Sequence, residues 1–155
     1  VFTSDHGEEL HDHGRWDHGY ALYEHQTDVP LIVRFPESRH AGRRVEPVVG
    51  LVDVMPTILD VVGATIPAAS QGRALTPLAA DGVGAVEAVF AEAVKWRPEQ
   101  RSVRTVRHKL IQDAKTGSLQ LFDLGTDPGE TRNLAATDTA TVERLLQALQ
   151  AHRAG

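Results

Sequence analysis

The chain has 155 residues, of which 41% are hydrophobic and 24% charged, a composition typical of one globular domain with a substantial core. Its formal net charge of −5 gives no electrostatic case for binding nucleic acid, and no apolar run approaches the length that crosses a membrane. The chain has no cysteine, which excludes disulfides, thiolate metal sites and a cysteine nucleophile within these residues.

The start of the chain is typical of a strand inside a longer protein. Val1 is not an initiator methionine, and no signal-peptide pattern follows it. The apolar residues 1–4 predict the end of a buried strand, followed by a turn at Asp5, His6 and Gly7. We therefore expect further residues upstream, and the compartment stays undetermined.

Two more apolar runs predict strands over residues 30–35 and 45–51. Such nearly continuous apolar strands are typical of a parallel sheet covered on both faces. A short helix is expected over residues 20–26. A longer helix is predicted from Asp53 to about residue 62, with Asp53 as its cap, Pro56 in the first turn and Gly63 past the end. Its buried face is expected to consist of Ile58, Leu59, Val61 and Val62.

The second half of the chain has a different pattern. Residues 66–84 are rich in Pro, Ala and Gly, with one helical turn expected at 75–80 and a subdomain boundary near residue 80. Short strands are predicted at 87–94, 102–106, 109–113 and 119–124, with a hairpin turn at Lys115, Thr116 and Gly117. A helix is expected over residues 138–153, with Asp138 or Thr139 as cap and an apolar face of Val142, Leu145, Leu146 and Leu149. The fold class is therefore α/β, followed by a small antiparallel sheet and a C-terminal helix.

Five of the eight histidines fall within the first 25 residues. Asp5 and His6 follow directly after a predicted strand, where α/β sheets form their sites. A carboxylate oxygen and an imidazole nitrogen at this point favour a shared divalent cation. His18, in the loop that follows, is the candidate that returns to the same pocket.

The other polar and aromatic residues near this segment are not expected to bind the metal. His11 and His13 are expected at the rim of the site, in supporting roles or without any role, and His25 is expected to cap or pack the short helix. Solvated positions are expected for Glu8, Glu9, Asp12 and Asp17. Trp16 serves either to stack on a sugar or aryl group or to anchor the loop. A further group could either line a cleft for anionic glycans or form a solvated strand edge. Its members are Trp96, Arg97, Arg101, Arg104 and Arg107.

Several motifs together resemble the sulfatase branch of the alkaline phosphatase superfamily. The segments TSDHGE, HDHGRWDHG and LYEHQTDVPLIVRFP occur in order within the first 36 residues. LVDVMPTIL from residue 51, GRAL from residue 72 and PL from residue 77 continue the pattern, with Ala74 where serine is usual. KLI from residue 109, LFDL from residue 121, DPGE from residue 127 and NL from residue 133 match the family's ending. The resemblance covers nearly the whole chain in order.

This resemblance implies roles for three residues. Asp5 and His6 match two metal ligands of the sulfatase site, although many sulfatases have asparagine at the second position. His18 matches a position where relatives carry lysine or histidine in contact with the transferred group. The implied cofactor is one divalent ion, Ca²⁺ first, with Mn²⁺ or Zn²⁺ as alternatives. Residues 1–80 would belong to the catalytic α/β domain and 81–155 to a small C-terminal subdomain.

The residues that the family needs for nucleophilic attack are absent from this sequence. Sulfatases use a formylglycine made from Cys or Ser in a C/S-x-P-x-R motif, and an early Asp-Asp metal pair. We therefore expect the nucleophile in a missing N-terminal half of the same protein and predict that these 155 residues alone are inactive. The implied substrate is a sulfated small molecule or glycan.

Three alternatives to a sulfatase remain open. The first is a phosphonate monoester hydrolase or phosphodiesterase of the same superfamily. The second is a phosphoethanolamine-type transferase, which uses threonine as nucleophile and normally has upstream membrane helices. The third is a non-catalytic remnant that binds anions or glycans through its arginines.

Overall fold

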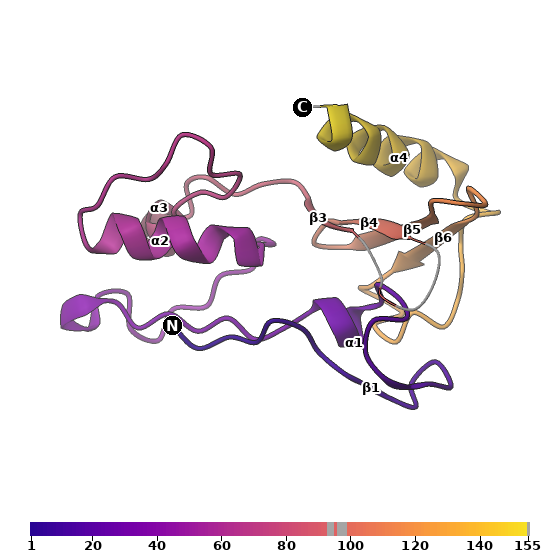
Figure 1. Cartoon of the computed structure of the whole chain (residues 1–155), viewed down its shortest axis with the longest axis horizontal. Coiled ribbons are helices and arrows are strands. Elements are labelled where there is room, and N and C mark those ends of the chain that lie inside the picture. Colours follow the sequence, from indigo (N-terminus) through magenta and orange to yellow (C-terminus); the bar gives the residue numbers. More distant parts are fainter. Residues whose placement is uncertain (93–94, 96–98, 155) are drawn as a thin grey trace. The chain divides into compact units, whose positions relative to one another are not determined.

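The computed structural model describes residues 1–92, 95 and 99–154, and the chain divides into two compact units (Figure 1). Unit 1 comprises Val1–Thr3 and Leu31–Glu87, and unit 2 comprises Ser4–Pro30 and Ala88–Gly155. The predicted α/β class is confirmed, with helices, a four-stranded antiparallel sheet and a C-terminal helix. The domain boundary predicted near residue 80 stays a prediction. The two units are groups of residues that pack together, and each combines two separate stretches of the sequence.

Unit 2 is built on a four-stranded sheet in the order β3-β4-β5-β6. The strands are β3 (Val89–Glu92), β4 (Gln100–Arg104), β5 (His108–Asp113) and β6 (Leu119–Asp123), and every pairing is antiparallel. All four lie where the sequence predicts strands, although the predicted residues 93–94 lie outside the described part of the chain. The expected hairpin turn joins β5 to β6, where Gly117 has a φ of +74° that favours glycine.

One face of the sheet packs against helix α4 (Thr139–Ala154), which lies across it in Figure 1. Val103, Leu110 and Leu121 point to this face because side chains alternate along each strand. The predicted apolar face of the helix supplies Val142, Leu145 and Leu149, all buried. The helix begins as expected, with the Thr141 backbone N–H donating to Asp138 Oδ1 at 3.1 Å.

The opposite face of the same sheet carries a mixed layer of charged and apolar side chains. Lys109, Ile111 and Phe122 share this face, since they alternate with Leu110 and Leu121. Leu22 packs on Ile111 and Phe122 just before helix α1 (Glu24–Thr27). The segment upstream of α1 forms a two-stranded hairpin of β1 (Glu9–Leu10) and β2 (Trp16–Asp17).

Unit 1 has less regular backbone pairing. Its elements are the 3-10 turns η1 (Pro36–Ser38) and η2 (Leu51–Asp53), helix α2 (Val54–Val61) and helix α3 (Thr76–Asp81). The strands predicted over residues 1–4 and 30–35 meet only at one antiparallel bridge between Phe2 and Ile32. The strand predicted over 45–51 is wrong. Within the described residues these segments have no partner strands to continue a ladder, so their extended backbone does not become a sheet.

Helix α2 begins and ends close to the prediction, but its packing differs. Asp53 stands before the helix without capping it by its side chain. Its carboxylate instead accepts bonds from the Gly50 and Arg73 backbone N–H groups, at 3.0 and 2.9 Å. The predicted buried face is also wrong, because Pro56 and Thr57 are buried while Ile58 is 45% exposed.

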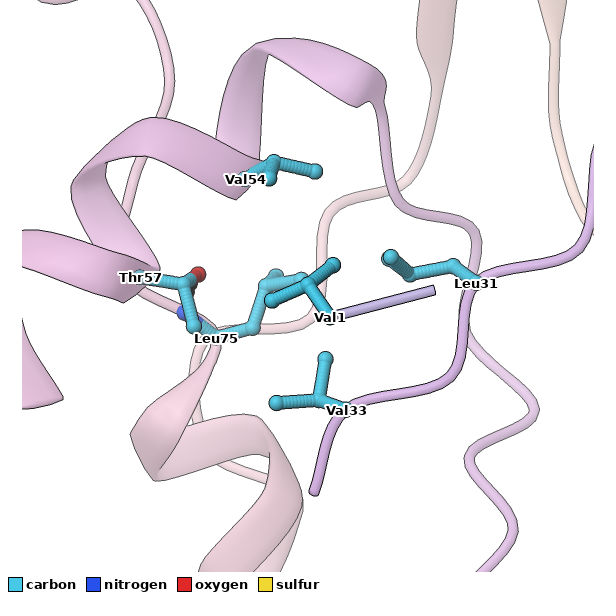
Figure 2. A pocket seen from close by; sticks show the side chains of 6 residues that line it. All are labelled: Val1, Leu31, Val33, Val54, Thr57 and Leu75. Carbon is cyan, nitrogen blue, oxygen red and sulfur yellow. Dashed lines mark hydrogen bonds between the residues drawn. The ribbon is translucent and has the colours of Figure 1, made fainter. Parts of the chain in front are cut away.

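Gly72 explains part of the GRAL motif in unit 1. A Cβ atom at this position would lie 1.9 Å from the carbonyl oxygen of Val52, so only glycine allows the two backbones to approach this closely. A small apolar recess nearby is lined by Val1, Leu31, Val33, Val54, Thr57 and Leu75 (Figure 2). Its lining has no titratable side chain, and we assign it to packing.

Candidate active site

The His-rich segment, residues 4–30, closes on itself through backbone contacts between Gly7 and helix α1. The Gly7 N–H donates to the Gln26 carbonyl oxygen at 2.9 Å. A Cβ atom on Gly7 would lie 2.0 Å from the His25 carbonyl oxygen. Gly7 is therefore required by this close approach of two backbones, where the sequence suggested only a turn. The contact brings the start of the segment next to α1.

Asp5 and His6, the predicted metal ligands, present their side chains together at the surface. Asp5 Oδ2 lies 3.8 Å from His6 Nε2, a separation that one ion can bridge at usual metal–ligand distances. His6 Nδ1 lies 2.9 Å from the Gly7 carbonyl oxygen. Since that oxygen only accepts, Nδ1 holds the ring proton and leaves Nε2 free to bind a cation.

The Asp5 carboxylate is kept ionised by its surroundings. Hydrogen bonds to backbone N–H groups, followed by the charge of His6, lower the pKa of Asp5. An ionised carboxylate beside an imidazole nitrogen provides one oxygen and one nitrogen donor. These residues therefore fit a divalent ion.

The structure also brings His18 to this pair, as the sequence predicts for one pocket. The His6 and His18 rings stack with centroids 4.1 Å apart. His18 Nδ1 faces carboxylates, 2.9 Å from Asp17 Oδ1 and 3.4 Å from Glu8 Oε2. This arrangement orients the ring and leaves Nε2 as the atom available to a substrate. The role of His18 in catalysis stays a prediction.

Glu8 is the residue of this group that the sequence analysis undervalued. His6, Glu8 and His18 each offer one ligand atom, and the three atoms lie within 4.8 Å of one another. Glu8 was expected to be solvated, and it remains 45% exposed, yet its carboxylate faces His18. No local pattern indicated this, because the contact joins Glu8 to a residue ten positions away across the β1–β2 hairpin.

Glu9 is where the expectation for the acidic residues is wrong. Its side chain is fully buried, and Glu9 Oε1 accepts a hydrogen bond from Gln26 Nε2 at 2.8 Å. Glu9 Oε1 also lies 3.1 Å from His25 Nε2. Strand β1 turns Glu9 inward while its neighbour Leu10 is exposed. His25 packs within helix α1, as predicted.

The arginines proposed for a cleft form ion pairs where the structure describes them. Arg101 pairs with Glu99 at 2.7 Å, Arg104 with Glu24 at 3.0 Å and Arg107 with Asp123 at 2.8 Å. Trp96 and Arg97 lie outside the described residues. Trp16 is 64% exposed and stacks with His11 at 5.8 Å. Contact of these residues with a glycan stays a prediction.

A buried ion network fastens the His-rich segment to the sheet. Lys109, 1% exposed, places Nζ 2.9 Å from Glu24 Oε1 and 2.7 Å from Thr27 Oγ1. Glu130 also accepts the Glu24 backbone N–H. These contacts explain the KLI and DPGE motifs of the sequence, since Lys109 and Glu130 both hold α1 from the sheet side.

The network shifts the acidity of its two glutamates in opposite directions. Burial alone would raise the pKa of Glu24, but ion pairs with Lys109 and Arg104 outweigh it and lower the pKa. Burial raises the pKa of Glu130, and Lys109 offsets this only in part. Arg104 and Lys109 therefore form their ion pairs mainly with Glu24.

Comparison with known proteins places this chain in a class, the sulfatase-like proteins of the alkaline phosphatase superfamily. Residues 11–154 match the family described as "N-sulphoglucosamine sulphohydrolase, C-terminal". The chain belongs to this family. The human arylsulfatase K is 32% identical over 147 residues, which cover 87% of this chain and 27% of that protein.

Two solved structures share the fold over 97% of the chain. One is a phosphonate monoester hydrolase from Silicibacter pomeroyi, with a TM-score of 0.83 and 30% identity. The other is described in complex with its substrate D-glucosamine-2-N,6-O-disulfate and has a TM-score of 0.81 and 26% identity. The chain spans 33% of each of these structures. Among the described residues, no helix has both the length and the apolar character needed to span a bilayer.

Proposed function

We propose that the protein carrying this chain is a metal-dependent sulfatase that hydrolyses sulfate esters. The observation that carries the proposal is the closeness of Asp5, His6 and His18 in a chain of a sulphohydrolase family. Asp5 Oδ2 lies 3.8 Å from His6 Nε2, and the His6 and His18 rings stack with centroids 4.1 Å apart. The neighbour that binds a glucosamine disulfate supports a sulfated small molecule or glycan as substrate. The attacking group is a formylglycine that lies outside this sequence.

Asp5 and His6 hold one divalent ion in this proposal, together with carboxylates from outside the chain. When bound, the ion neutralises negative charge on the sulfuryl oxygens. His18 contacts the sulfuryl group through Nε2 or gives its proton to the leaving oxygen. Glu8 and Asp17 hold the His18 ring in position.

The proposed ion is Ca²⁺, with Mn²⁺ and Zn²⁺ as the alternatives. Resemblance to sulfatases supports Ca²⁺. The His6 nitrogen argues for the softer ions, since imidazole suits Mn²⁺ and Zn²⁺ better than Ca²⁺. Metal analysis of the purified protein after dialysis distinguishes the three.

A phosphonate monoester hydrolase is the second candidate function. It is favoured by the Silicibacter pomeroyi structure, which matches the chain with higher identity and TM-score than the sulfate-bound neighbour. Both reactions need a cation and a proton donor beside a transferred oxyanion. The residues of the site therefore suit either substrate.

The decisive experiment assays the protein at its full natural length on matched aryl esters. We expect faster turnover of an aryl sulfate than of an aryl phosphonate monoester, and the reverse order would replace the sulfatase proposal with the second candidate. Asp5→Ala and His6→Ala should reduce bound metal. His18→Ala should keep the metal and lower kcat by about 10²–10⁴-fold.

His11→Ala is the matched control, because His11 belongs to the same segment but stacks on exposed Trp16. It should retain wild-type metal content and rate. Unchanged metal in both Asp5→Ala and His6→Ala would refute their assignment as ligands. Wild-type kinetics in His18→Ala would refute its catalytic role.

The two remaining alternatives depend on the residues encoded upstream of Val1. A Cys or Ser within C/S-x-P-x-R supports the hydrolase, and a threonine nucleophile supports a phosphoethanolamine-type transferase. A frame with no nucleophile leaves an anion-binding remnant. In each case we expect no ester hydrolysis by residues 1–155 alone.

A further inference from the structure

A second group of metal-binding side chains lies in unit 2, made of residues outside the candidate active site. His13, His25 and Glu130 each offer one ligand atom, and these three atoms lie within 4.8 Å of one another. They come from the loop between β1 and β2, from α1 and from the turn after β6. Distant parts of the sequence therefore supply one compact set of donors.

Glu130 is the unsatisfied member of the group. Its side chain is 1% exposed, yet Oε1 has no hydrogen-bond partner. The nearest cation, Lys109 Nζ, is 3.7 Å away and is already bound by Glu24 and Thr27. A buried carboxylate oxygen without a partner is costly, and a cation between Glu130 and the two imidazoles would satisfy it.

The charge around the group points in the same direction. The carboxylates around the group are those of Glu9, Asp12, Glu24 and Glu130, whereas the cations are Arg15, Arg104 and Lys109. Arg104 and Lys109 both bind Glu24 directly. Glu9, fully buried beside His25, has its own unpartnered oxygen, Oε2. The surroundings therefore hold one more negative charge than positive charge and favour an added cation.

The two imidazoles are held in place before any ion arrives. His13 stacks on Tyr23 with ring centroids 3.8 Å apart and planes 8° apart. The Tyr23 hydroxyl bonds with the Gln120 side chain on β6, and the His13 and His25 rings are 5.2 Å apart. Fixed rings lose little freedom on binding, which strengthens a metal site.

We propose that His13, His25 and Glu130 form a second Zn²⁺ site, with water as the fourth ligand, that clamps the His-rich segment to the turn after β6. Two nitrogens and one carboxylate oxygen are a donor set that suits Zn²⁺. Glu9 Oε1 lies 3.1 Å from His25 Nε2, so a second carboxylate borders the proposed site. The proposal does not depend on the sulfatase activity, since its residues are separate from Asp5, His6 and His18.

The test removes the candidate active-site ligands first and then counts the zinc that remains. The full-length protein with Asp5→Asn and His6→Gln is stripped with a chelator and titrated with Zn²⁺ against a chromophoric zinc indicator. We expect one equivalent of zinc to bind and to raise the Tm. Adding His13→Asn and His25→Gln should abolish this equivalent and the rise in Tm.

Two further variants distinguish a loss of zinc binding from a loss of folding. Glu130→Gln keeps the shape of the side chain and should weaken zinc at least about 10-fold while the circular dichroism spectrum is unchanged. His11→Ala, in the same loop but outside the group, should keep the full equivalent. The proposal is overturned if the Asp5→Asn and His6→Gln protein binds no zinc, or if zinc survives His13→Asn and His25→Gln.

Discussion

Unit 2 and unit 1 are stabilised by different means. Unit 2 packs both faces of its sheet, with an apolar core under α4 on one face and a buried ion network under α1 on the other. Unit 1 leaves large apolar side chains exposed along η2 and α2, including Val52, Met55 and Ile58. Its short elements are instead joined by backbone N–H groups that donate to the Asp53 and Thr57 side chains, and by the Thr57 hydroxyl, which donates to a backbone carbonyl oxygen. A substitution should therefore have very different effects in the two units.

Lys109→Ala should have the largest effect and would break unit 2. Removing the buried ammonium leaves Glu24 with one cation and Glu130 with none in a buried setting. The expected loss is about 3–5 kcal/mol of unfolding free energy, measured by urea titration. Lys109→Met, which keeps most of the side-chain volume, tests the charge itself. A loss under 1 kcal/mol in both variants would contradict the role given to the network.

A matched pair of apolar truncations should sharpen the comparison. Leu149→Ala, in the core under α4, is expected to cost about 2–5 kcal/mol because it leaves a cavity. Ile58→Ala on α2 removes a side chain that is 45% exposed and should change stability by less than about 0.5 kcal/mol. Urea titration of both variants measures the difference. Equal costs would show that α2 is covered in the folded protein.

Thr57→Val tests the hydrogen bonds that join the elements of unit 1. Thr57 Oγ1 donates to the Asp53 carbonyl oxygen at 2.6 Å and accepts the Leu75 N–H at 2.9 Å. Valine leaves that buried N–H unpaired, at a cost of about 1–3 kcal/mol. Faster amide hydrogen exchange at Leu75 should report the loss locally. Thr57→Ser, which keeps the hydroxyl, should retain wild-type exchange.

The smallest effect is expected from acid acting on one ion pair of unit 2. The hydrogen bond from Arg107 lowers the pKa of Asp123 from its ordinary 3.8 to about 2. Because the pKa is lower in the folded state, this contribution is complete above pH 3.8 and is lost as the pH falls through about 2. Asp123→Asn should flatten that part of the curve of Tm against pH. If the slope of Tm against pH is the same in Asp123→Asn as in the wild type, other carboxylates cause the loss of stability in acid.

Local patterns in the sequence were sufficient for most of unit 2. The short apolar runs at β4, β5 and β6, the turn residues between β5 and β6, and the apolar face of α4 predicted these elements, since each pattern is decided by neighbours within a few residues. Unit 1 was predicted less well. Residues 45–51 are apolar enough for a strand but find no partner strand among the described residues, and pairing is a property that composition cannot supply.

The residues of the site also fall into two groups: those that local sequence indicates and those that depend on partners far along the chain. Asp5, His6 and His18 were recognisable from their spacing and family resemblance, and the structure brings their side chains together. The sequence does not predict the burial of Glu9 or of Glu130, because both depend on partners that lie far away along the chain. His25 is sixteen positions from Glu9, and Lys109 is 21 positions from Glu130.

The anchoring of α1 has a consequence for the order of folding. The contacts of Glu24 with Arg104, Lys109 and Glu130 close loops of 80, 85 and 106 residues. Contacts so distant in sequence form slowly, since the entropy of closing the loop is lost before the contact stabilises it. The sheet β3–β6 consists of neighbouring hairpins, which close sooner. We expect the His-rich segment to dock last, so that the candidate active site is assembled in the final step of folding.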